Sequence, residues 1–189
     1  MILPCTKESV NKIAEYAKIR PVVIPTDTLY GLSMSIEGDI SIVYRLKRRD
    51  LKKPIPIGVA SIEMMENLGY LDERAKRLVY EFMPGPLTIV VRARKRILGW
   101  EKIALRIPNH PIPLALMNRV GAITLTSANI SGEKAPVSIE DTMKINVKYR
   151  IDCGKLRGIP STVVDLTQGV KLIREGAISY SQILQVLEE

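Results

Sequence analysis

Short apolar segments alternate along the chain with segments of helical periodicity. Runs rich in valine and isoleucine are typical of buried strands, which we predict at 21–25, 55–60, 87–92, 103–107, 122–126, 149–153, 161–166 and 171–174. Apolar residues recur every three to four positions over 7–18, 40–48 and 73–82, so these segments are predicted helices. The mixture predicts one α/β domain over residues 1–189: an open, twisted, mixed sheet with flanking helices, whose strand order stays undetermined.

The predicted helices begin beside side chains that can accept a hydrogen bond from the first turn, namely Thr6, Asp39 and Asp72. Two later pairs have the spacing of a capping box, Ser138 with Asp141 and Ser179 with Gln182. These pairs predict further helix starts in the last third of the chain.

The composition is that of a soluble globular protein, with 46% apolar and 25% charged residues among 189. No apolar run approaches the roughly 18 residues that a transmembrane helix needs. The N-terminus, MILPCTKESVNK, lacks the basic start and apolar core of a signal peptide. We therefore expect a cytoplasmic protein without membrane partners.

Cysteine and histidine offer little chemistry in the linear sequence. Cys5 and Cys153 lie far apart and form no metal-spaced pair, and His110 is the one histidine. We therefore expect no zinc cage and no metal held by side chains, and a histidine-assisted nucleophile would have to use His110. The chemistry is expected to rely on charge and positioning.

The net charge is +8, from 28 basic and 20 acidic residues, which suits a nucleic acid, a nucleotide or another anionic ligand. Solubility alone explains a charge of this size equally well. The GxxxxGK[ST] phosphate loop, the GxGxxG turn and the protein-kinase motifs are absent from the sequence. If ATP binds, it is held by other means.

Four polar clusters interrupt the apolar pattern. They read PTDTLYGL at 25–32, LKRRDLKKP at 46–54, TLTSANISG at 124–132, and GIPSTVVDL at 158–166 with LIREG at 172–176. Hydroxyl and amide groups at strand ends can hold a small polar ligand, and the cations of the second cluster suit phosphates. Each cluster alone also fits a turn or a solvated run of charge, so none decides the function by itself.

A further cation, Arg106, lies inside the apolar run 103–107. An unpaired charge in a buried strand is costly, so Arg106 is expected to meet a partner.

Taken in order, these clusters resemble the YrdC family, whose members are threonylcarbamoyl-AMP synthases. PTDTLYGL is similar to the family motif PT[DE]T-x-YGL, and Lys47-x-Arg49 with Ser127-x-Asn129 is similar to its KxR and SxN pairs. Further matches in the family's order are MPGPLT at 83–88, LRIPNHP at 105–111, TSANISG at 126–132, STVVD at 161–165 and IREGAI at 173–178. The resemblance runs from about residue 7 to residue 177.

The resemblance implies a concave basic pocket in which L-threonine, bicarbonate and ATP give threonylcarbamoyl-AMP and pyrophosphate for tRNA modification. Positions that match ATP contacts are Lys47, Arg49, Ser127, Asn129 and Arg174, of which Lys47 and Arg49 also match catalytic positions. Positions that match L-threonine contacts are Thr26, Arg106 and Ser161, and weaker matches are Thr28, Tyr30, Lys53 and Thr126. Magnesium is implied with ATP, no organic cofactor is implied, and the machinery that transfers threonylcarbamoyl to tRNA is the implied partner.

Two positions depart from the family pattern. Gly58 stands where many members have a histidine that helps to read the threonine hydroxyl, and Lys53 stands where many have asparagine. The departure at Gly58 leaves the discrimination between threonine and serine open. The chain also ends where longer members add a second domain, so it resembles the short, YrdC-only form.

Two alternatives remain beside the synthase. One is an RNA-binding module that uses a basic concave surface, although one Phe and one Trp offer little for base stacking. The other is a paralogue that acts on a different carbamoyl compound. For the synthase, any direct tRNA or RNA binding is expected to be weak.

Overall fold

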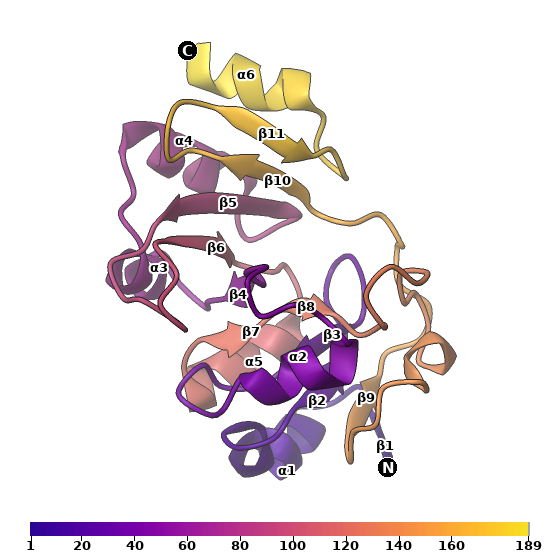
Figure 1. Cartoon of the computed structure of the whole chain (residues 1–189). Coiled ribbons are helices and arrows are strands. Elements are labelled where there is room, and N and C mark those ends of the chain that lie inside the picture. The colour runs from indigo at the N-terminus through magenta and orange to yellow at the C-terminus, as the bar shows by residue number, and fades with distance from the viewer. Residues whose placement is uncertain (189) are drawn as a thin grey trace.

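The computed structural model describes residues 1–188 and contains two open mixed β-sheets with helices packed against them (Figure 1). The α/β class predicted from the sequence is confirmed, but the expectation of a single sheet is wrong. The chain starts at the free edge of one sheet and ends in a helix beside the far edge of the other (Figure 1). Within residues 1–188, no helix combines the length and the apolar character needed to cross a membrane.

The first sheet has five short strands. In spatial order they are β1 (Ile2–Pro4), β9 (Arg150–Asp152), β2 (Val22–Ile24), β3 (Gly31–Ser33) and β8 (Thr126–Ser127). Strand β9 is parallel to both β1 and β2, and the remaining pairs are antiparallel. The edge strand β1 therefore joins the sheet through a segment near the other end of the sequence.

The second sheet has six strands. In spatial order they are β11 (Lys171–Arg174), β10 (Thr162–Asp165), β5 (Leu87–Arg92), β6 (Lys102–Arg106), β4 (Ile57–Gly58) and β7 (Ile123–Thr124). The β10–β5 and β4–β6 pairs are parallel, and the other pairs are antiparallel. The long central strands β5 and β6 provide the surface on which the site is built.

The segment 122–126, predicted as one strand, passes from one sheet to the other. Its first part, β7, pairs with β4, and β8 follows after a single residue and pairs with β3. Between them the Leu125 N–H donates to the Pro56 carbonyl oxygen at 2.8 Å, and the Thr124 N–H donates to that of Met34 at 2.8 Å. This crossing explains why there are two sheets, since the segment supplies a short edge strand to each.

Helices cover the outer faces of both sheets. Helices α1 (Lys7–Ala17) and α5 (Pro111–Val120) pack on each other and against the first sheet, and α2 (Ser41–Lys47) lies on its other face. Three helices lie on the side of the second sheet: α3 (Ile62–Leu68), α4 (Glu73–Phe82) and α6 (Tyr180–Glu188). Helix α4 packs against both α6 and β5.

The predicted helix starts are mostly confirmed. Thr6 caps α1, Asp72 caps α4, and Ser179 forms the full capping box with Gln182 at α6. Asp39 lies one residue too early to be the cap of α2, although its carboxylate still accepts from the Ser41 N–H at 3.1 Å. The Asp141 carboxylate accepts from the Ser138 N–H as predicted, but the segment forms only a 3-10 turn (Glu140–Thr142), because the chain soon leads into β9.

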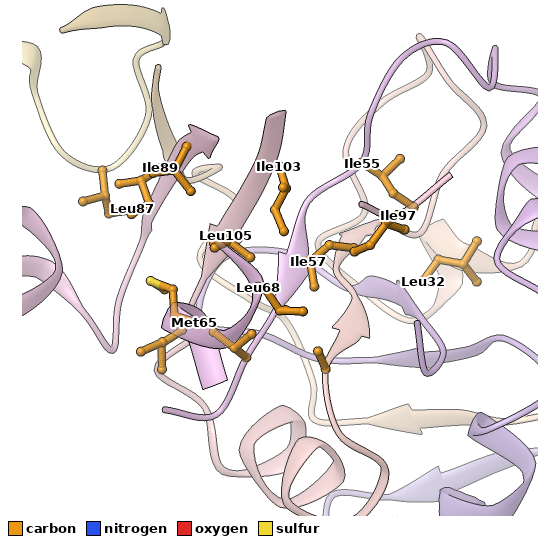
Figure 2. Packing of buried hydrophobic residues seen from close by; sticks show 14 of the residues in the cluster. Leu32, Ile55, Ile57, Met65, Leu68, Leu87, Ile89, Ile97, Ile103 and Leu105 are labelled. Carbon is orange, nitrogen blue, oxygen red and sulfur yellow. The ribbon is translucent and has the colours of Figure 1, made fainter. Parts of the chain in front are cut away.

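Alternation along the strands divides the second sheet into an apolar face and a polar face. Leu87 and Ile89 of β5 and Leu105 of β6 point toward Met65 and Leu68 of α3 and belong to the larger core cluster (Figure 2). The intervening side chains on the same strands face the opposite side, where the candidate site lies.

A disulfide joins Cys5 to Cys153, with Cα atoms 4.9 Å apart. The two cysteines lie far apart in the sequence but meet in the fold, because the parallel β1–β9 register pairs Pro4 with Asp152 and so brings the next residue of each strand alongside. Closing a loop across a sequence separation of 148 restricts the unfolded chain, with a stabilisation of about 5 kcal/mol in the chain-entropy account.

Candidate active site

A cavity of about 510 Å³ lies between the polar face of the second sheet and the β3–β8 edge of the first. Its floor consists of alternate side chains from neighbouring strands: Thr88 and Val90 from β5, Lys102, Ala104 and Arg106 from β6, and Ser161, Val163 and Asp165 at β10. The predicted concave basic pocket is therefore present. Its volume falls within the range of about 300–1,000 Å³ that is usual for small-molecule sites.

Arg106 is the most buried cation on the floor, with 5% of its surface exposed. Its Nε donates to the Gly85 carbonyl oxygen at 3.0 Å, its Nη1 to Thr28 Oγ1 at 3.0 Å and its Nη2 to Asp27 Oδ1 at 2.6 Å. A guanidinium has five N–H groups, so two remain for a ligand. A planar pair of free donors suits a carboxylate.

Asp27 is the partner that the buried Arg106 requires, and it was not among the predicted site residues. The ion pair is 2.6 Å long, with both side chains largely buried. Burial lowers the pKa of Arg106, while the Asp27 carboxylate opposes that shift. The sequence held a signal for this pair, since Asp27 is the acidic residue of the PTDT cluster and Arg106 needed a counter-charge.

The turn after β2 is held by the Thr26 hydroxyl. Thr26 Oγ1 accepts from the N–H groups of Thr28 and Leu29 at 3.1 Å and donates to the Leu29 carbonyl oxygen at 2.7 Å. Thr26 and Thr28 both line the cavity, but Thr28 is the one that contacts Arg106. The hydroxyl of Thr26 is thus engaged in shaping the wall around Arg106.

Tyr30 also lines the cavity and is fully buried. Its hydroxyl is directed toward the end of β9, where it contacts the Gly154 carbonyl oxygen at 2.7 Å and Asp152 Oδ1 at 3.1 Å and accepts from the Cys153 N–H at 2.9 Å. Burial raises the pKa of Tyr30 to about 12. The ring of Tyr30 is therefore part of the cavity wall, and its hydroxyl holds the end of β9, next to the disulfide.

Ser161 lies on the same floor, next to Thr88, and is 5% exposed. Its Oγ is 2.9 Å from Thr88 Oγ1, and Arg174 Nη2 donates to Ser161 Oγ at 3.2 Å and to its carbonyl oxygen at 2.8 Å. Ser161, predicted to contact L-threonine, and Arg174, predicted to contact ATP, therefore lie next to each other. Thr88 was missed as a site residue, although it ends the MPGPLT string.

Lys47 lies in the last turn of α2 and is buried, with 2% exposed. Its ammonium donates to the carbonyl oxygens of Ser127 and Asn129, the latter at 2.8 Å, and to Asn129 Oδ1 at 3.4 Å. The Ser131 N–H donates back to the Lys47 carbonyl oxygen at 2.9 Å. All three ammonium protons are therefore engaged with the loop after β8.

Burial and the nearby Arg49 charge lower the pKa of Lys47 to about 8. The ammonium is therefore mostly charged at pH 7, and it holds one wall of the cavity in place.

Ser127, Asn129 and Thr126 form that wall together. Ser127 Oγ donates to Asn129 Oδ1 at 2.6 Å, and Asn129 Nδ2 donates to the Glu133 carbonyl oxygen at 2.8 Å. With its proton committed to Asn129, the Ser127 hydroxyl offers a lone pair to a ligand donor. Thr126, the first residue of β8, also lines the cavity.

Arg49 follows α2 and lines the cavity near its mouth. Its Nε donates to the Lys53 carbonyl oxygen at 3.1 Å and its Nη2 to that of Pro54 at 3.1 Å. The remaining N–H groups are unengaged within the described chain and suit a phosphate. The Lys53 side chain is exposed and is not among the cavity-lining residues, so Lys53 acts here through its backbone.

A second ion pair closes the far end of the floor. Lys102 Nζ lies 3.2 Å from Asp165 Oδ2. Both residues line the cavity and neither was predicted. Strand alternation was the signal, because it places Lys102 on the same face as Arg106 and Asp165 on the same face as Ser161.

Gly58 is not among the cavity-lining residues. A Cβ added there would lie 3.2 Å from Met117 Sδ and 3.3 Å from Leu125 Cδ2. A larger side chain at 58 would have to displace these core atoms, so the glycine matches its packed surroundings.

Asp165 is the one carboxylate among the cavity-lining residues within 1–188, and Lys102 already neutralises it. The lining therefore lacks the several oxygen anions of a protein-held magnesium site. It does fit a magnesium ion that arrives on the phosphates of a nucleotide and keeps several of its waters.

Comparison with known proteins connects this geometry to a family. The family model described as "Telomere recombination", which covers Sua5, YciO and YrdC, matches residues 17–176. A Methanocaldococcus jannaschii protein is 33% identical over 96% of this chain and 94% of its own length. The threonylcarbamoyl-AMP synthase of Pyrococcus abyssi is 34% identical over 89% of this chain and 54% of its own length.

A solved structure with the same architecture is that of P. abyssi Sua5 complexed with L-threonine, at 29% identity and a TM-score of 0.93. The match covers 99% of this chain and 61% of the Sua5 chain, so this chain spans only part of that protein. The matched region includes both sheets and the whole cavity. The chain belongs to the Sua5–YciO–YrdC family.

Proposed function

We propose that this protein joins L-threonine, carbon dioxide or bicarbonate, and ATP into threonylcarbamoyl-AMP, with release of pyrophosphate, for the modification of adenosine in tRNA. The observation that carries the proposal is the cavity with a buried guanidinium at one end and Arg49 at the other. The relatives named above support it, since one is a threonylcarbamoyl-AMP synthase and one was crystallised with L-threonine.

The amino acid is assigned to the Arg106 end. The two free N–H groups of Arg106 bind the threonine carboxylate, and Asp27 keeps the guanidinium in orientation. Thr28 contacts Arg106, and Ser161 lies on the same floor beyond Thr88, so both offer hydroxyls to the amino acid. Thr26 supports this arrangement by holding the turn.

ATP is assigned to the other end. Arg49 neutralises phosphate charge with its free N–H groups, and Ser127 contacts the nucleotide. Arg174 is bound to Ser161 and is close enough to Arg106 for its charge to lower the pKa of Arg106, so we assign it to a phosphate near the amino acid. Lys47 acts as a positioning residue, because its protons hold the Ser127–Asn129 wall.

The reaction then needs two steps. The threonine amine adds to carbon dioxide and loses a proton, which gives an N-carboxylate. An oxygen of this carboxylate attacks the α-phosphorus of ATP, and the bond between that phosphorus and the bridging oxygen breaks as pyrophosphate leaves. Such a transfer requires alignment and charge neutralisation rather than a covalent nucleophile, which agrees with the residues that line the cavity. Magnesium bound to ATP would neutralise phosphate charge.

The direct test is pyrophosphate release from ATP with L-threonine and bicarbonate omitted in turn. We expect release only when both are present. Release without threonine would contradict the proposal, and release with a different amine in its place would favour the paralogue that acts on another carbamoyl compound. Serine is the sharpest competitor, since one methyl group gives only about 1–3 kcal/mol of discrimination.

A binding experiment distinguishes the synthase from an RNA-binding module. Labelled tRNA is titrated at two salt concentrations, with and without saturating ATP and threonine. An RNA surface makes many phosphate contacts, so its affinity falls steeply with salt, whereas a triphosphate in a confined cavity is less sensitive. We expect ATP binding to persist and tRNA binding to be weak. Tight tRNA binding that ignores ATP, without ATP binding, would favour the RNA module.

A further inference from the structure

The fold gathers every cysteine and the one histidine of the chain at a single point. The sequence contains two Cys and one His, and the ligand atoms of Cys5, His110 and Cys153 all lie within 4.8 Å of one another. The residues come from three distant parts of the chain: the end of β1, the start of α5 and the end of β9. This cluster lies outside the cavity lining, so the proposed reaction does not account for it.

We propose that, when the disulfide is reduced, Cys5, Cys153 and His110 form a binding site for a thiophilic divalent cation such as Zn²⁺, with water as a fourth ligand. The disulfide and the metal-bound form are then alternative states of the same site. A dithiol reductant opens the disulfide by transferring two electrons and two protons, and is itself left as a disulfide. Metal binding then releases the two thiol protons to solvent.

The geometry suits a tetrahedral ion. Zinc binds sulfur at about 2.3 Å and nitrogen at about 2.0–2.1 Å, so its ligand atoms are about 3.3–3.8 Å apart. The present separations of at most 4.8 Å fall within reach of that arrangement after small side-chain rotations. Once reduced, the two sulfurs need only to move from bonding distance to non-bonded contact, and Cys5 is exposed enough to do so.

The position of the histidine also suits metal binding. His110 is the N-cap residue of α5, and one of its ring nitrogens lies within 4.8 Å of both sulfur atoms. The neutral imidazole is the form that binds metals. His110 Nδ1 now accepts the Ile112 N–H at 3.2 Å and so caps α5. A neutral ring that binds a metal through either nitrogen has no free lone pair for this hydrogen bond, so metal binding exchanges a helix cap for a metal bond.

The experiment uses the full chain, reduced with a trialkylphosphine, which leaves as its oxide with oxygen taken from water. The reductant is removed without oxygen, and the chain is titrated with Co²⁺ and then Zn²⁺. We expect one Co²⁺ per reduced chain, with thiolate-to-cobalt charge-transfer absorption that disappears when Zn²⁺ is added. The oxidised chain should show no such absorption.

Two variants test the ligand set. Replacing both cysteines, by Cys5→Ser with Cys153→Ser, should abolish the charge-transfer band. His110→Asn removes the imidazole but keeps a good helix cap, so it separates the metal ligand from the cap. It should weaken cobalt binding by at least about tenfold, as loss of even an outer-shell partner does.

The proposal is wrong if the reduced chain shows no thiolate–cobalt band, or if His110→Asn binds cobalt as tightly as the unchanged chain. A band that survives loss of both cysteines would also contradict it. These readouts are spectroscopic and do not depend on turnover, so they stand whether or not the synthase proposal holds.

Discussion

The two ends of the cavity carry similar cations but are built differently. At one end lies Arg106, which projects from β6, an inner strand of the second sheet. It is 5% exposed and is bound to Asp27, Thr28 and Gly85. At the other end Arg49 follows the end of a helix and is held by two backbone carbonyls of its own loop. A cation on the floor is therefore part of the core as well as of the site, whereas a cation at the mouth acts mainly on the ligand.

The largest expected effect is that of Arg106→Ala. It should lower the free energy of unfolding by about 3–5 kcal/mol, because it leaves the Asp27 carboxylate buried without its partner. It should also raise the threonine requirement of pyrophosphate release. Chemical denaturation and threonine titration measure the two effects.

A double variant sharpens this result. Arg106→Ala with Asp27→Asn removes the unpaired charge, so most of the stability should return while threonine use stays impaired. Recovery of both properties together would show that Arg106 serves only the fold.

Arg49→Ala is expected to act on the ligand alone. Turnover and ATP affinity should fall by about 100-fold, which is the size expected for a lost charged contact in a transition state, with the melting temperature unchanged. Lys52→Ala is the matched control, because Lys52 is an exposed cation of the same loop outside the cavity lining. Equal losses in both variants would mean that only overall charge matters.

Lys47 gives an effect that depends on pH. Its pKa is about 8 in the folded chain against an ordinary value of 10.5, so between these values the unfolded chain holds a proton that the folded chain has released. The free energy of unfolding should therefore rise with pH in this window, by about 2 kcal/mol relative to Lys47→Met. Denaturation of both proteins at pH 8 and pH 10.5 measures the difference, and parallel curves would contradict it.

The smallest expected effect is that of Ser161→Ala. The variant loses hydrogen bonds to Thr88 and Arg174, so stability should fall by about 1 kcal/mol and the threonine requirement should rise several-fold. Ser33→Ala is the control, since Ser33 Oγ is the one buried side-chain polar atom without a hydrogen-bond partner in residues 1–188. That change should cost little or nothing.

The local parts of the fold followed from the sequence, and the long-range parts did not. Strands β5, β6 and β10 were predicted because their apolar runs are long enough to be recognised. Strands β1 and β3 were missed, since each has only three residues and depends on pairing: β1 pairs with the distant β9, and β3 pairs with the nearby β2 and the distant β8. The same limit explains Cys5 and Cys153, which are joined across a separation of 148.

In the candidate site, the predicted residues are brought together apart from the Lys53 side chain. What the sequence could not supply is how each side chain is engaged. Lys47 and Arg49 are two residues apart. All the ammonium protons of Lys47 are bound to the Ser127–Asn129 wall, whereas Arg49 keeps N–H groups free for a ligand. That difference depends on the helix end between them, where Arg48 takes a left-handed conformation with φ of 51°.

The pairing of β9 with both β1 and β2 has a consequence for synthesis on the ribosome. Strand β9 begins at residue 150 of 189, so the two N-terminal strands are made long before the strand that lies between them. At 5–20 residues per second, translation from β2 to β9 takes roughly 6–25 s. For that time the nascent N-terminal region has open strand edges that other chains can pair with. Three-residue strands keep those edges short, which limits the risk until β9 emerges.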